Sequence, residues 1–284
     1  MVGLTCYYPF GAEGTTLKIP MLAHLRRRLG LIRSLITYWR PGRQRPLQKL
    51  YRPFIAPGDR VFDIGAHLGD RSAAFAALGA RVVAVEPQPE FQAWLQRLVG
   101  FRGFRDSRYK VEIVPEAVGC ESGTAQLAIS YANPTVSSMA GEWRDTLQRS
   151  APGFRHVRWE ETVTVPVTTL DALIGRFGAP RFCKIDVEGF EVQVLAGLSY
   201  PIEALSFEFI TGALDQAMLC LAELDRLGVY EFNAIAGEGR DFIWPQWQSR
   251  EKAERWLEAG VDGIASGDLY ARLVARPGLE LGNI

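Results

Sequence analysis

The 284-residue sequence lacks several features that would place it in a specialised class of protein. No segment approaches the roughly 18 consecutive apolar residues that a membrane-spanning helix requires. Residues 1–20 do not combine a charged start with an apolar stretch and a small-residue cleavage site, so we expect a protein that is not secreted. The chain also has no internal repeat and no low-complexity tract, and we therefore expect an ordinary globular protein.

Cysteine is scarce in this chain and shows no C-x-x-C pair or other spacing typical of a metal site. The four cysteines are Cys6, Cys120, Cys183 and Cys220. We predict free thiols in a reducing compartment and a cytoplasmic location. With 48% hydrophobic and 23% charged residues, the composition predicts a soluble protein with a sizeable core, and the length suits one large α/β domain with extensions.

The formal net charge is zero, yet the charges are unevenly distributed along the chain. Residues 1–52 contain ten lysines and arginines and a single acid, Glu13, so the other residues carry an excess of acid. We interpret residues 1–52 as a basic N-terminal helical arm and residues 53–284 as the main domain. An arm of this kind suits packing on the acidic body of the chain, on a partner subunit or on an anionic surface.

Within the arm, apolar residues recur at spacings of three and four, which predicts one stripe of a helix that ends before Pro41. The stripe consists of Leu22, Leu25, Leu29, Ile32, Ile36 and Trp39. We expect it to dock on the main domain or on a second copy of the chain, as in a homo-oligomer. Weak binding of the basic helix to a membrane surface is the alternative.

After residue 53, short apolar segments alternate with helical ones, which is typical of a mostly parallel sheet with helices on both faces. The expected strands are 60–64, 81–85, 111–114, 125–130, 182–186, 204–209, 229–235 and 269–274. Helices are expected over 71–78, 89–99, 190–198 and 218–227. Residues 133–161 have no period and are interpreted as an insertion over the site, and a C-terminal extension is expected from about residue 236.

The clearest local signal is a buried strand that runs into a glycine-containing turn and a helix over residues 61–70. Gly65 and Gly69 allow the backbone to turn sharply, and Asp63 stands at a strand end, where open parallel sheets bind ligands. The next strand ends at Glu86, whose carboxylate can accept hydrogen bonds from both ribose hydroxyls. The two turns therefore predict a nucleoside-binding half-site. Its candidate cofactor-binding residues are Asp63, Gly65, Ala66, His67, Gly69, Glu86 and Pro87.

The spacing of the glycines favours one class of nucleoside. The dinucleotide fingerprint G-x-G-x-x-G is absent, because Gly65 and Gly69 have no third glycine in phase. A cofactor without phosphates therefore fits better. S-adenosylmethionine has an adenosine for Glu86 and a cationic amino-acid end that Asp63 could attract. An NAD(P)-dependent oxidoreductase and a non-catalytic nucleoside-binding module are the alternatives.

Two later segments, V-P-V-T-T-L-D at 165–171 and K-I-D-V-E-G-F-E-V-Q-V-L-A-G at 184–197, carry a family resemblance. Together with the turn at 63–66 and the Glu-Pro pair at 86–87, they resemble the FkbM family of S-adenosylmethionine-dependent methyltransferases over roughly residues 57–210. The resemblance implies a Rossmann-like class I methyltransferase fold. It also implies O-methylation of a hydroxyl of a small molecule, sugar or glycan, with no nucleic-acid partner.

The resemblance also implies roles for residues outside the two turns. Glu116 follows the third expected strand, where methyltransferases of this fold often contact adenine. Ser137 and Ser138 lie in a loop that the resemblance places over the cofactor. The chain departs from the family at His67, where asparagine is usual, and this departure affects only the side-chain contact expected from that residue.

Three carboxylates mark the expected reaction side of the site. Asp186 and Glu188 are two residues apart at a strand end, so an extended backbone would point both into the crevice, and Glu208 ends the following strand. Crowding and burial raise carboxyl pKa values, which suits a general base. We predict Asp186 or Glu188 as the base, with Glu208 positioning the substrate. A divalent metal held by the three carboxylates is an alternative that we do not favour, because no ligand spacing demands one.

Overall fold

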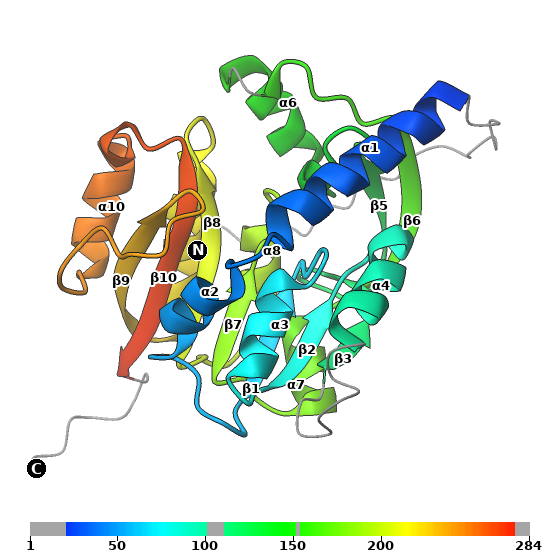
Figure 1. Cartoon of the computed structure of the whole chain (residues 1–284). Helices are drawn as coiled ribbons and strands as arrows, with labels where there is room; N and C mark the ends of the chain where they lie inside the picture. The colour runs from blue at the N-terminus through cyan, green and yellow to red at the C-terminus, as the bar shows by residue number, and fades with distance from the viewer. Residues whose placement is uncertain (1–20, 101–110, 152–153, 276–284) are drawn as a thin grey trace, which may run out of the picture.

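The structure, a computed structural model, describes residues 21–100, 111–151 and 154–275. Its main sheet has seven strands in the order β3-β2-β1-β7-β8-β10-β9, and β10 runs antiparallel to both of its neighbours (Figure 1). The strands are β1 (Arg60–Ile64), β2 (Arg81–Val85), β3 (Val111–Val114), β7 (Phe182–Ile185), β8 (Ala204–Ile210), β9 (Val229–Ala236) and β10 (Ser266–Ala275). This arrangement confirms the predicted α/β fold with a mostly parallel sheet.

Helices cover both faces of the main sheet, because alternate residues of each buried strand point to opposite sides. Val61 of β1 and Val82 of β2 face one core, whereas Phe62 and Val83 face the other. The helices of the first core are α2 (Gln44–Tyr51), α3 (Asp70–Ala77) and α4 (Pro89–Leu95). Those of the second core are α7 (Leu170–Phe177), α8 (Glu191–Ala196), α9 (Leu214–Leu227) and α10 (Arg250–Glu258).

A second sheet of three strands, in the order β4-β6-β5, extends the domain (Figure 1). Its strands are β4 (Ala117–Val118), β5 (Gly123–Ile129) and β6 (Glu161–Thr168). The predicted insertion at 133–161 contains η2 (Pro134–Val136) and α6 (Gly141–Ser150). Both elements contribute residues to the wall of the cavity described below.

Some elements differ from the sequence-based expectation. The motif at 165–171 spans the junction of β6 and α7, neither of which was predicted as an element, and Thr169 caps α7 by accepting the N–H of Ala172 at 3.0 Å. The predicted helix 89–99 is α4 followed by a π-helical turn, η1 (Gln96–Gly100). The expected C-terminal extension is part of the main sheet, because β10 lies between β8 and β9. A short 3₁₀ turn, η4 (Val261–Gly263), leads into β10.

Residues 21–52, the described part of the basic N-terminal arm, contain two helices, of which the first, α1 (Met21–Tyr38), was predicted from its periodicity. The second, α2, buries Leu47, Leu50 and Tyr51 in the first core of the main domain. The ring of Tyr51 meets that of Phe75 on α3, with 4.6 Å between the ring centroids. No break in packing therefore marks the predicted boundary near residue 52.

The apolar stripe of α1 was expected to dock on the main domain or on a second copy of the chain, and four of its residues do not dock on the main domain. They are 50–67% exposed: Leu25, Leu29, Ile32 and Ile36. The neighbouring face docks instead, because Gly30 lets α1 approach so closely that a Cβ there would lie 2.3 Å from the carbonyl oxygen of Tyr131. Trp39, at the end of the stripe, does dock, and its Nε1 donates to the carbonyl oxygen of Leu68 at 3.0 Å.

The cysteines differ in oxidation state. Cys183 and Cys220 are buried free thiols, as predicted. Cys120 is disulfide-bonded, so the prediction of a free thiol is wrong for this residue, and Cys6 lies outside the described residues. Cysteine spacing along the chain did not show this bond, because a disulfide depends on proximity in the folded protein.

Within the part of the chain that the structure describes, no helix combines the length and the apolar character needed to cross a membrane.

Candidate active site

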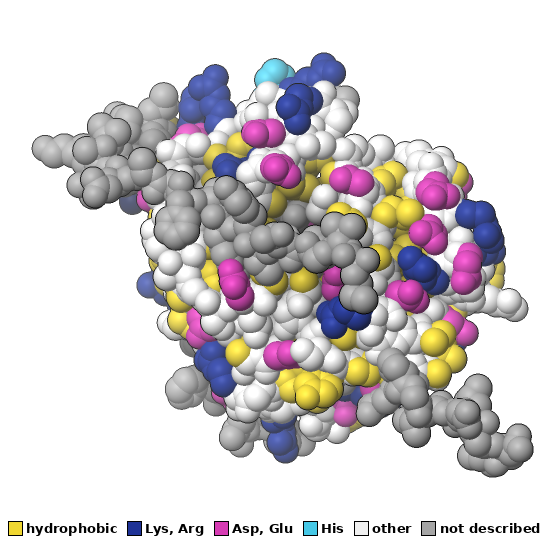
Figure 2. Space-filling model, turned by 180° about the vertical axis from the view of Figure 1, so that it is seen from behind, with side chains coloured by type: hydrophobic (Ala, Val, Ile, Leu, Met, Phe, Trp, Pro, Cys, Tyr) yellow, Lys and Arg dark blue, Asp and Glu magenta, His cyan; other side chains and the backbone are white. Residues whose placement is uncertain are grey.

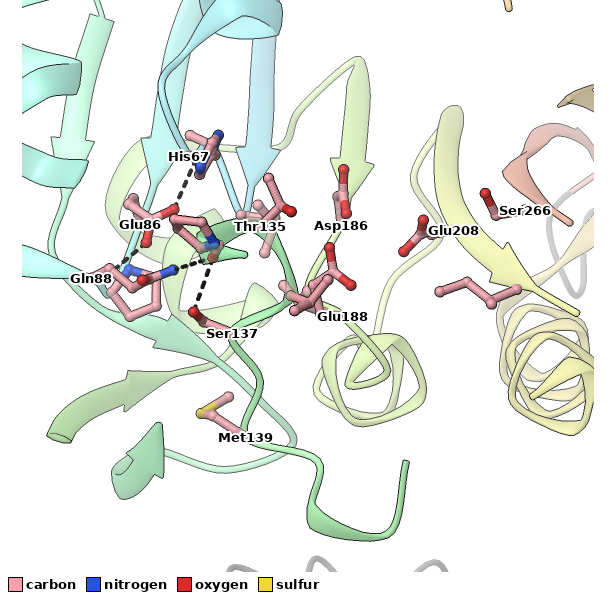
Figure 3. Close-up of a pocket in the computed structure, with 18 of the residues that line it drawn as sticks. His67, Glu86, Gln88, Thr135, Ser137, Met139, Asp186, Glu188, Glu208 and Ser266 are labelled. Carbon is pink, nitrogen blue, oxygen red and sulfur yellow. Dashed lines mark hydrogen bonds between the residues drawn. The ribbon is translucent and has the colours of Figure 1, made fainter. Parts of the chain in front are cut away.

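A cavity of about 570 Å³ opens along the carboxyl ends of β1, β2, β7 and β8. Figure 3 shows Glu86 on one side of this cavity and Glu188 and Glu208 across from it. The cavity has the size of a small-molecule site, and it lies where open α/β sheets bind their ligands. The topology therefore brings the predicted nucleoside-binding half-site and the three carboxylates of the predicted reaction side into a single pocket.

The turn after β1 joins the two sides of the cavity. Gly65 has a φ of 81°, and a Cβ on it would lie 1.8 Å from the carbonyl oxygen of Asp186. Gly69 has a φ of 76° and precedes α3, where a Cβ would lie 2.3 Å from Leu95. Gly65 lines the cavity, whereas Gly69 is not among the lining residues and serves to pack α3 against α4.

Gly65→Ala should lower the free energy of unfolding by about 2 kcal/mol or more, because the added methyl group must displace the backbone of Asp186 at a φ that disfavours side chains. Chemical denaturation measures this loss. Gly123→Ala on β5 is a matched control, since a Cβ there would meet nothing within 4 Å. Equal stability of the two variants would contradict the close approach at Gly65.

Glu86 is held at the end of β2 by two backbone donors. The N–H of His67 donates to Oε2 and the N–H of Gln88 donates to Oε1, both at 2.8 Å (Figure 3). Burial raises the pKa of Glu86 to about 7, although the two donors oppose the rise. Each oxygen keeps a further lone pair, so the carboxyl group can also accept hydrogen bonds from the hydroxyls of a ligand.

His67 lines the cavity from the turn after β1, with a φ of 50°. Its ring lies between those of Tyr38 and Phe91, with centroid distances of 5.3 and 4.1 Å. Burial lowers the pKa of His67 to about 4, so the ring is neutral at pH 7. Its buried Nε2 has no hydrogen-bond partner among the described residues.

Asp63 lies buried at the end of β1 and accepts a hydrogen bond from the hydroxyl of Ser72. Burial raises the pKa of Asp63 to about 6. Ala66, Pro87 and Glu116 also line the cavity. Glu116 accepts hydrogen bonds from Nη1 of Arg176 at 2.9 and 3.1 Å, so a contact from Glu116 to a ligand would share its carboxylate with this ion pair.

Ser138 does not line the cavity, whereas its neighbour Ser137 does. The hydroxyl of Ser138 donates to the carbonyl oxygen of Glu188 at 2.6 Å and accepts the N–H of Ala140 at 2.9 Å. Ser137 Oγ donates to the carbonyl oxygen of Pro134 at 2.9 Å. In this structure Ser138 therefore forms a bridge between the insertion and the turn that carries Glu188.

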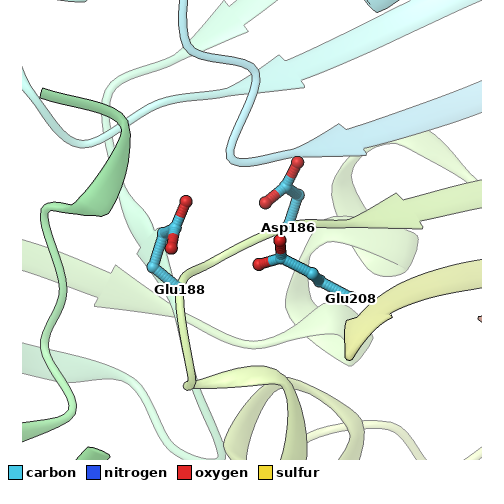
Figure 4. A group of neighbouring side chains, drawn as sticks. All are labelled: Asp186, Glu188 and Glu208. Carbon is cyan, nitrogen blue, oxygen red and sulfur yellow. The ribbon is translucent and has the colours of Figure 1, made fainter. Parts of the chain in front are cut away.

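Asp186, Glu188 and Glu208 form a group that we call the acidic cluster. One carboxylate oxygen from each residue lies within 4.8 Å of the other two. Figure 4 shows Asp186 directly after β7, Glu188 in the following turn and Glu208 on β8. The sheet brings these residues together because parallel β7 and β8 end at the same edge.

Lys184 gives Asp186 a different role from the two glutamates. The Lys184 side chain is 1% exposed, and its Nζ lies 2.6 Å from Oδ2 of Asp186. Burial by itself would raise the pKa of Asp186, but attraction to Lys184 and Arg71 lowers the pKa below its usual value. Asp186 is therefore an ionised carboxylate with its own counter-ion. This makes it a weaker proton acceptor than its neighbours, and a metal ion would compete with Lys184 for it.

Glu188 and Glu208 have the opposite electrostatic environment. Burial raises the pKa of Glu188, and the charges of Asp186 and Glu191 raise it further. The pKa of Glu208 is raised by burial and then by Glu188 and Asp186. Neighbouring carboxyl groups of this kind titrate as a coupled pair, so protonation of one favours ionisation of the other.

The turn that carries Glu188 has an unusual backbone for its sequence. Glu188 has a φ of 53°, in the left-handed region that glutamate rarely adopts, and Gly189 follows with a φ of 86°. Trp143 of α6 packs so closely on Gly189 that a Cβ would lie 2.2 Å from the indole ring. The N–H of Val187 donates to Oε1 of Glu191 at 3.0 Å. This turn directs Glu188 into the cavity, and α8 begins without a side-chain cap.

Sequence reasoning missed several polar residues of the cavity wall, among them Tyr38, Arg71 and Glu238. The Nη2 of Arg71 lies 3.4 Å from Glu238, and its buried Nε has no hydrogen-bond partner among the described residues. Arg71 stands two residues after Gly69, at the start of α3, and that placement was the one signal that could have identified it. Tyr38 and Glu238 come from α1 and from the turn after β9, and no local pattern links them to the site.

The chain matches the family model described as the methyltransferase FkbM domain over residues 63–246. This span begins at Asp63 and includes Glu86 and the whole acidic cluster. The chain is also similar to AglP, a hexuronic acid methyltransferase of Haloferax volcanii. The two are 24% identical over 184 residues, which cover 63% of this chain and 67% of that protein.

Among the solved structures similar to this chain are two methyltransferases. Methyltransferase FkbM from Methylobacillus flagellatus has a TM-score of 0.44 at 14% identity, with 79% of this chain and 50% of that chain covered. This chain therefore spans half the length of that protein. A TehB-like methyltransferase from Corynebacterium glutamicum has a TM-score of 0.43 at 10% identity, with 89% of this chain and 100% of that chain covered.

Proposed function

We propose that this chain, which belongs to the FkbM family of S-adenosylmethionine-dependent methyltransferases, transfers a methyl group to a hydroxyl of a small molecule or a sugar. Its sheet order, with β10 as the antiparallel strand, is the Rossmann-like class I methyltransferase fold. The observation that carries the proposal is the acidic cluster, which faces Glu86 across one cavity. The family match supports this activity over that of an NAD(P)-dependent oxidoreductase, and the acidic cluster supports catalysis over nucleoside binding alone.

The β1 and β2 side of the cavity fits the methyl donor. Glu86 has free lone pairs for the ribose hydroxyls, and an apolar wall that includes Val118, Leu127 and Met139 suits an adenine ring. The ionised Asp186 and the other acids of the cavity attract the cationic methionine end. When bound, S-adenosylmethionine supplies an electrophilic methyl group on a sulfonium.

The β7 and β8 side of the cavity provides a proton acceptor for the acceptor hydroxyl. A hydroxyl is a poor nucleophile until it begins to lose its proton, and a nearby carboxylate can take that proton. Glu188 and Glu208 have raised pKa values, so whichever of them is ionised is a stronger base than an ordinary glutamate. In the transfer, the hydroxyl oxygen bonds to the methyl carbon, the sulfur keeps the electron pair of the broken bond, and the proton goes to the carboxylate.

A sugar is the acceptor class that the far end of the cavity favours. Glu208, Thr211 and Ser266 line this end, and carboxylate and hydroxyl groups form hydrogen bonds to polyols. Arg71 also lines the cavity, and its guanidinium provides a positive charge that would attract a carboxylate on the acceptor. The similarity to a hexuronic acid methyltransferase supports an acidic sugar.

The test is to incubate the protein with S-adenosylmethionine that carries a deuterated methyl group and a panel of uronic acids, neutral sugars and phenols. Mass spectrometry of the products should show a deuteromethyl group on a hydroxyl oxygen, with uronic acids preferred. Calorimetry with S-adenosylhomocysteine and NAD separates the alternatives. Binding of NAD without binding of S-adenosylhomocysteine, or methylation at nitrogen or carbon instead of oxygen, would overturn the proposal.

Glu86→Ala should weaken the binding of S-adenosylhomocysteine by about 1.5–3 kcal/mol, the range for hydrogen bonds to a charged group. The substitution removes the acceptor at the end of β2, where the carboxyl group lines the cavity. Isothermal calorimetry measures the affinity. Glu112→Ala, on the exposed side of β3, is the control and should bind as the unmodified protein does. Unchanged affinity in folded Glu86→Ala protein would refute the ribose contact.

A further inference from the structure

The outer face of α1 is the most concentrated apolar surface on the described part of the molecule. Eight large apolar side chains are exposed among the described residues, and four of them lie on this helix. The four are Leu25 at 53%, Leu29 at 56%, Ile32 at 50% and Ile36 at 67%. Their spacing of three and four residues places them in one continuous stripe, which we call the outer stripe.

The outer stripe faces away from the domain because the opposite side of α1 is anchored. Arg27 forms ion pairs with Glu90 and Glu161. Leu31 packs with Leu68 and Phe91. These contacts fix the rotation of α1 about its own axis, so turning the outer stripe inward would break them.

Exposed arginines border the outer stripe on both sides. With 3.6 residues per turn, Arg26 and Arg33 follow one edge and Arg28 follows the other. The helix contains no Asp or Glu, and Arg40 and Arg45 extend the exposed basic surface beyond it. On the face seen in Figure 2, by contrast, acidic and basic side chains are interspersed.

This arrangement of charges distinguishes between two possible binding partners of the outer stripe, a second copy of the chain and a membrane surface. A second copy of α1 packed on the first would bring arginines against arginines, with no acid on either helix to neutralise them. An anionic lipid surface provides the opposite charge as well as an apolar layer, and arginine side chains can extend to the headgroups while their neighbours enter that layer.

We propose that α1 binds the surface of an anionic membrane, with the outer stripe in the interfacial layer and the flanking arginines at the headgroups. The helix lies parallel to the membrane plane and does not cross it. The other end of α1 contributes Tyr38 to the cavity wall, so membrane contact would hold the active site beside the lipid surface. This inference does not depend on the proposed methyl transfer.

The test is sedimentation of the full chain with vesicles of phosphatidylcholine mixed with phosphatidylserine, and with vesicles of phosphatidylcholine alone. We expect binding to the mixed vesicles that weakens as salt is raised. The double substitution Leu29→Asp with Ile32→Asp should weaken partitioning about a hundredfold, because two apolar anchors are lost and two like charges are brought to the surface. Arg26→Gln with Arg28→Gln should weaken it about tenfold.

The matched control is Tyr200→Asp with Leu219→Asp, which places the same charges at exposed apolar residues outside α1. This variant should bind vesicles as the unmodified chain does. Circular dichroism and calorimetry with S-adenosylhomocysteine show that each variant is folded. Absence of vesicle binding by the unmodified chain would overturn the proposal. A second outcome would also overturn the proposal. The unmodified chain would be a dimer, and Leu29→Asp with Ile32→Asp would convert it to a monomer without changing vesicle binding. The outer stripe would then be a contact between two copies of the chain.

Discussion

Replacing Glu188 by Gln lowers the turnover of methyl transfer by about 10²- to 10⁴-fold and leaves the affinity for S-adenosylhomocysteine nearly unchanged, if Glu188 is the proton acceptor. The amide keeps the size of the side chain but cannot take a proton from the acceptor hydroxyl. Steady-state kinetics and calorimetry on the same preparation separate the two effects. Glu208→Gln gives the matching measurement for the other glutamate, and the variant with the larger loss of turnover identifies the base.

The pH dependence of turnover provides a second readout of the same prediction. A general base acts when it is ionised, so the rate falls as the pH drops below its pKa. Burial and the charge of Asp186 raise the pKa of both Glu188 and Glu208, so the fall should begin at a higher pH than an ordinary glutamate would give. Replacing one glutamate removes its repulsion of the other and lowers the pKa of the remaining one, so the fall in turnover should then shift to lower pH.

Two control measurements test the assignment of the base. Glu258→Gln, on the exposed surface of α10, should retain full turnover. If Lys184 is the cation that neutralises Asp186, a chelator should not change the turnover of the unmodified enzyme. If the chelator abolishes turnover and added Mg²⁺ restores it, the acidic cluster binds a metal ion. Full turnover in both glutamine variants would exclude both glutamates as the base.

Replacing Lys184 by Met should lower the free energy of unfolding by about 3–5 kcal/mol, the usual cost of breaking a buried ion pair on one side. Lys184 is 1% exposed and lies 2.6 Å from Asp186, with Asp268 at 3.9 Å. Without the lysine, the carboxylates stay in a cavity wall without their nearest positive charge. Urea denaturation monitored by fluorescence measures the loss.

Lys252→Met, on the exposed side of α10, should change the free energy of unfolding very little and is the matched control. Adding Asp186→Asn to Lys184→Met should restore part of the stability, because the unpaired charge is then removed as well. The penalty should also shrink at low pH. In the Lys184 variant the pKa of Asp186 rises, and the penalty disappears once the carboxyl is protonated in both the folded and the unfolded chain. A Lys184→Met protein as stable as the unmodified one would show that this ion pair contributes nothing to folding.

Residues that are close in sequence allowed most of the cavity wall at the ends of β1 and β2 to be predicted. Asp63, Gly65 and Glu86 lie at the ends of short buried strands, and parallel strands necessarily place those ends at one edge of the sheet. The three acids were predicted for the same reason, because β7 and β8 are neighbouring parallel strands. The motif at 165–171 supported the family resemblance, although its strand and helix were not predicted.

Local sequence could not show how segments distant along the chain meet. Tyr38, Arg71 and Glu238 come together at the cavity wall from three separate elements. Ser138 was expected at a cofactor, but the path of the insertion places its hydroxyl on the backbone of Glu188. Its contacts depend on the packing of α6 and the second sheet, which no periodicity in residues 133–161 reveals.

The sequence by itself determined the alternating fold, the positions of the strand-end carboxylates and the amphipathic character of α1, because each depends on residues a few positions apart. Tertiary structure alone decided which face of α1 is covered, since docking depends on the close approach at Gly30 and on ion pairs with Glu90 and Glu161. It also decided the direction in which each carboxyl pKa is shifted. Charge state depends on burial and on neighbours in space, and the fold places Lys184 and Arg71 near Asp186 while it leaves Glu188 and Glu208 among other acids.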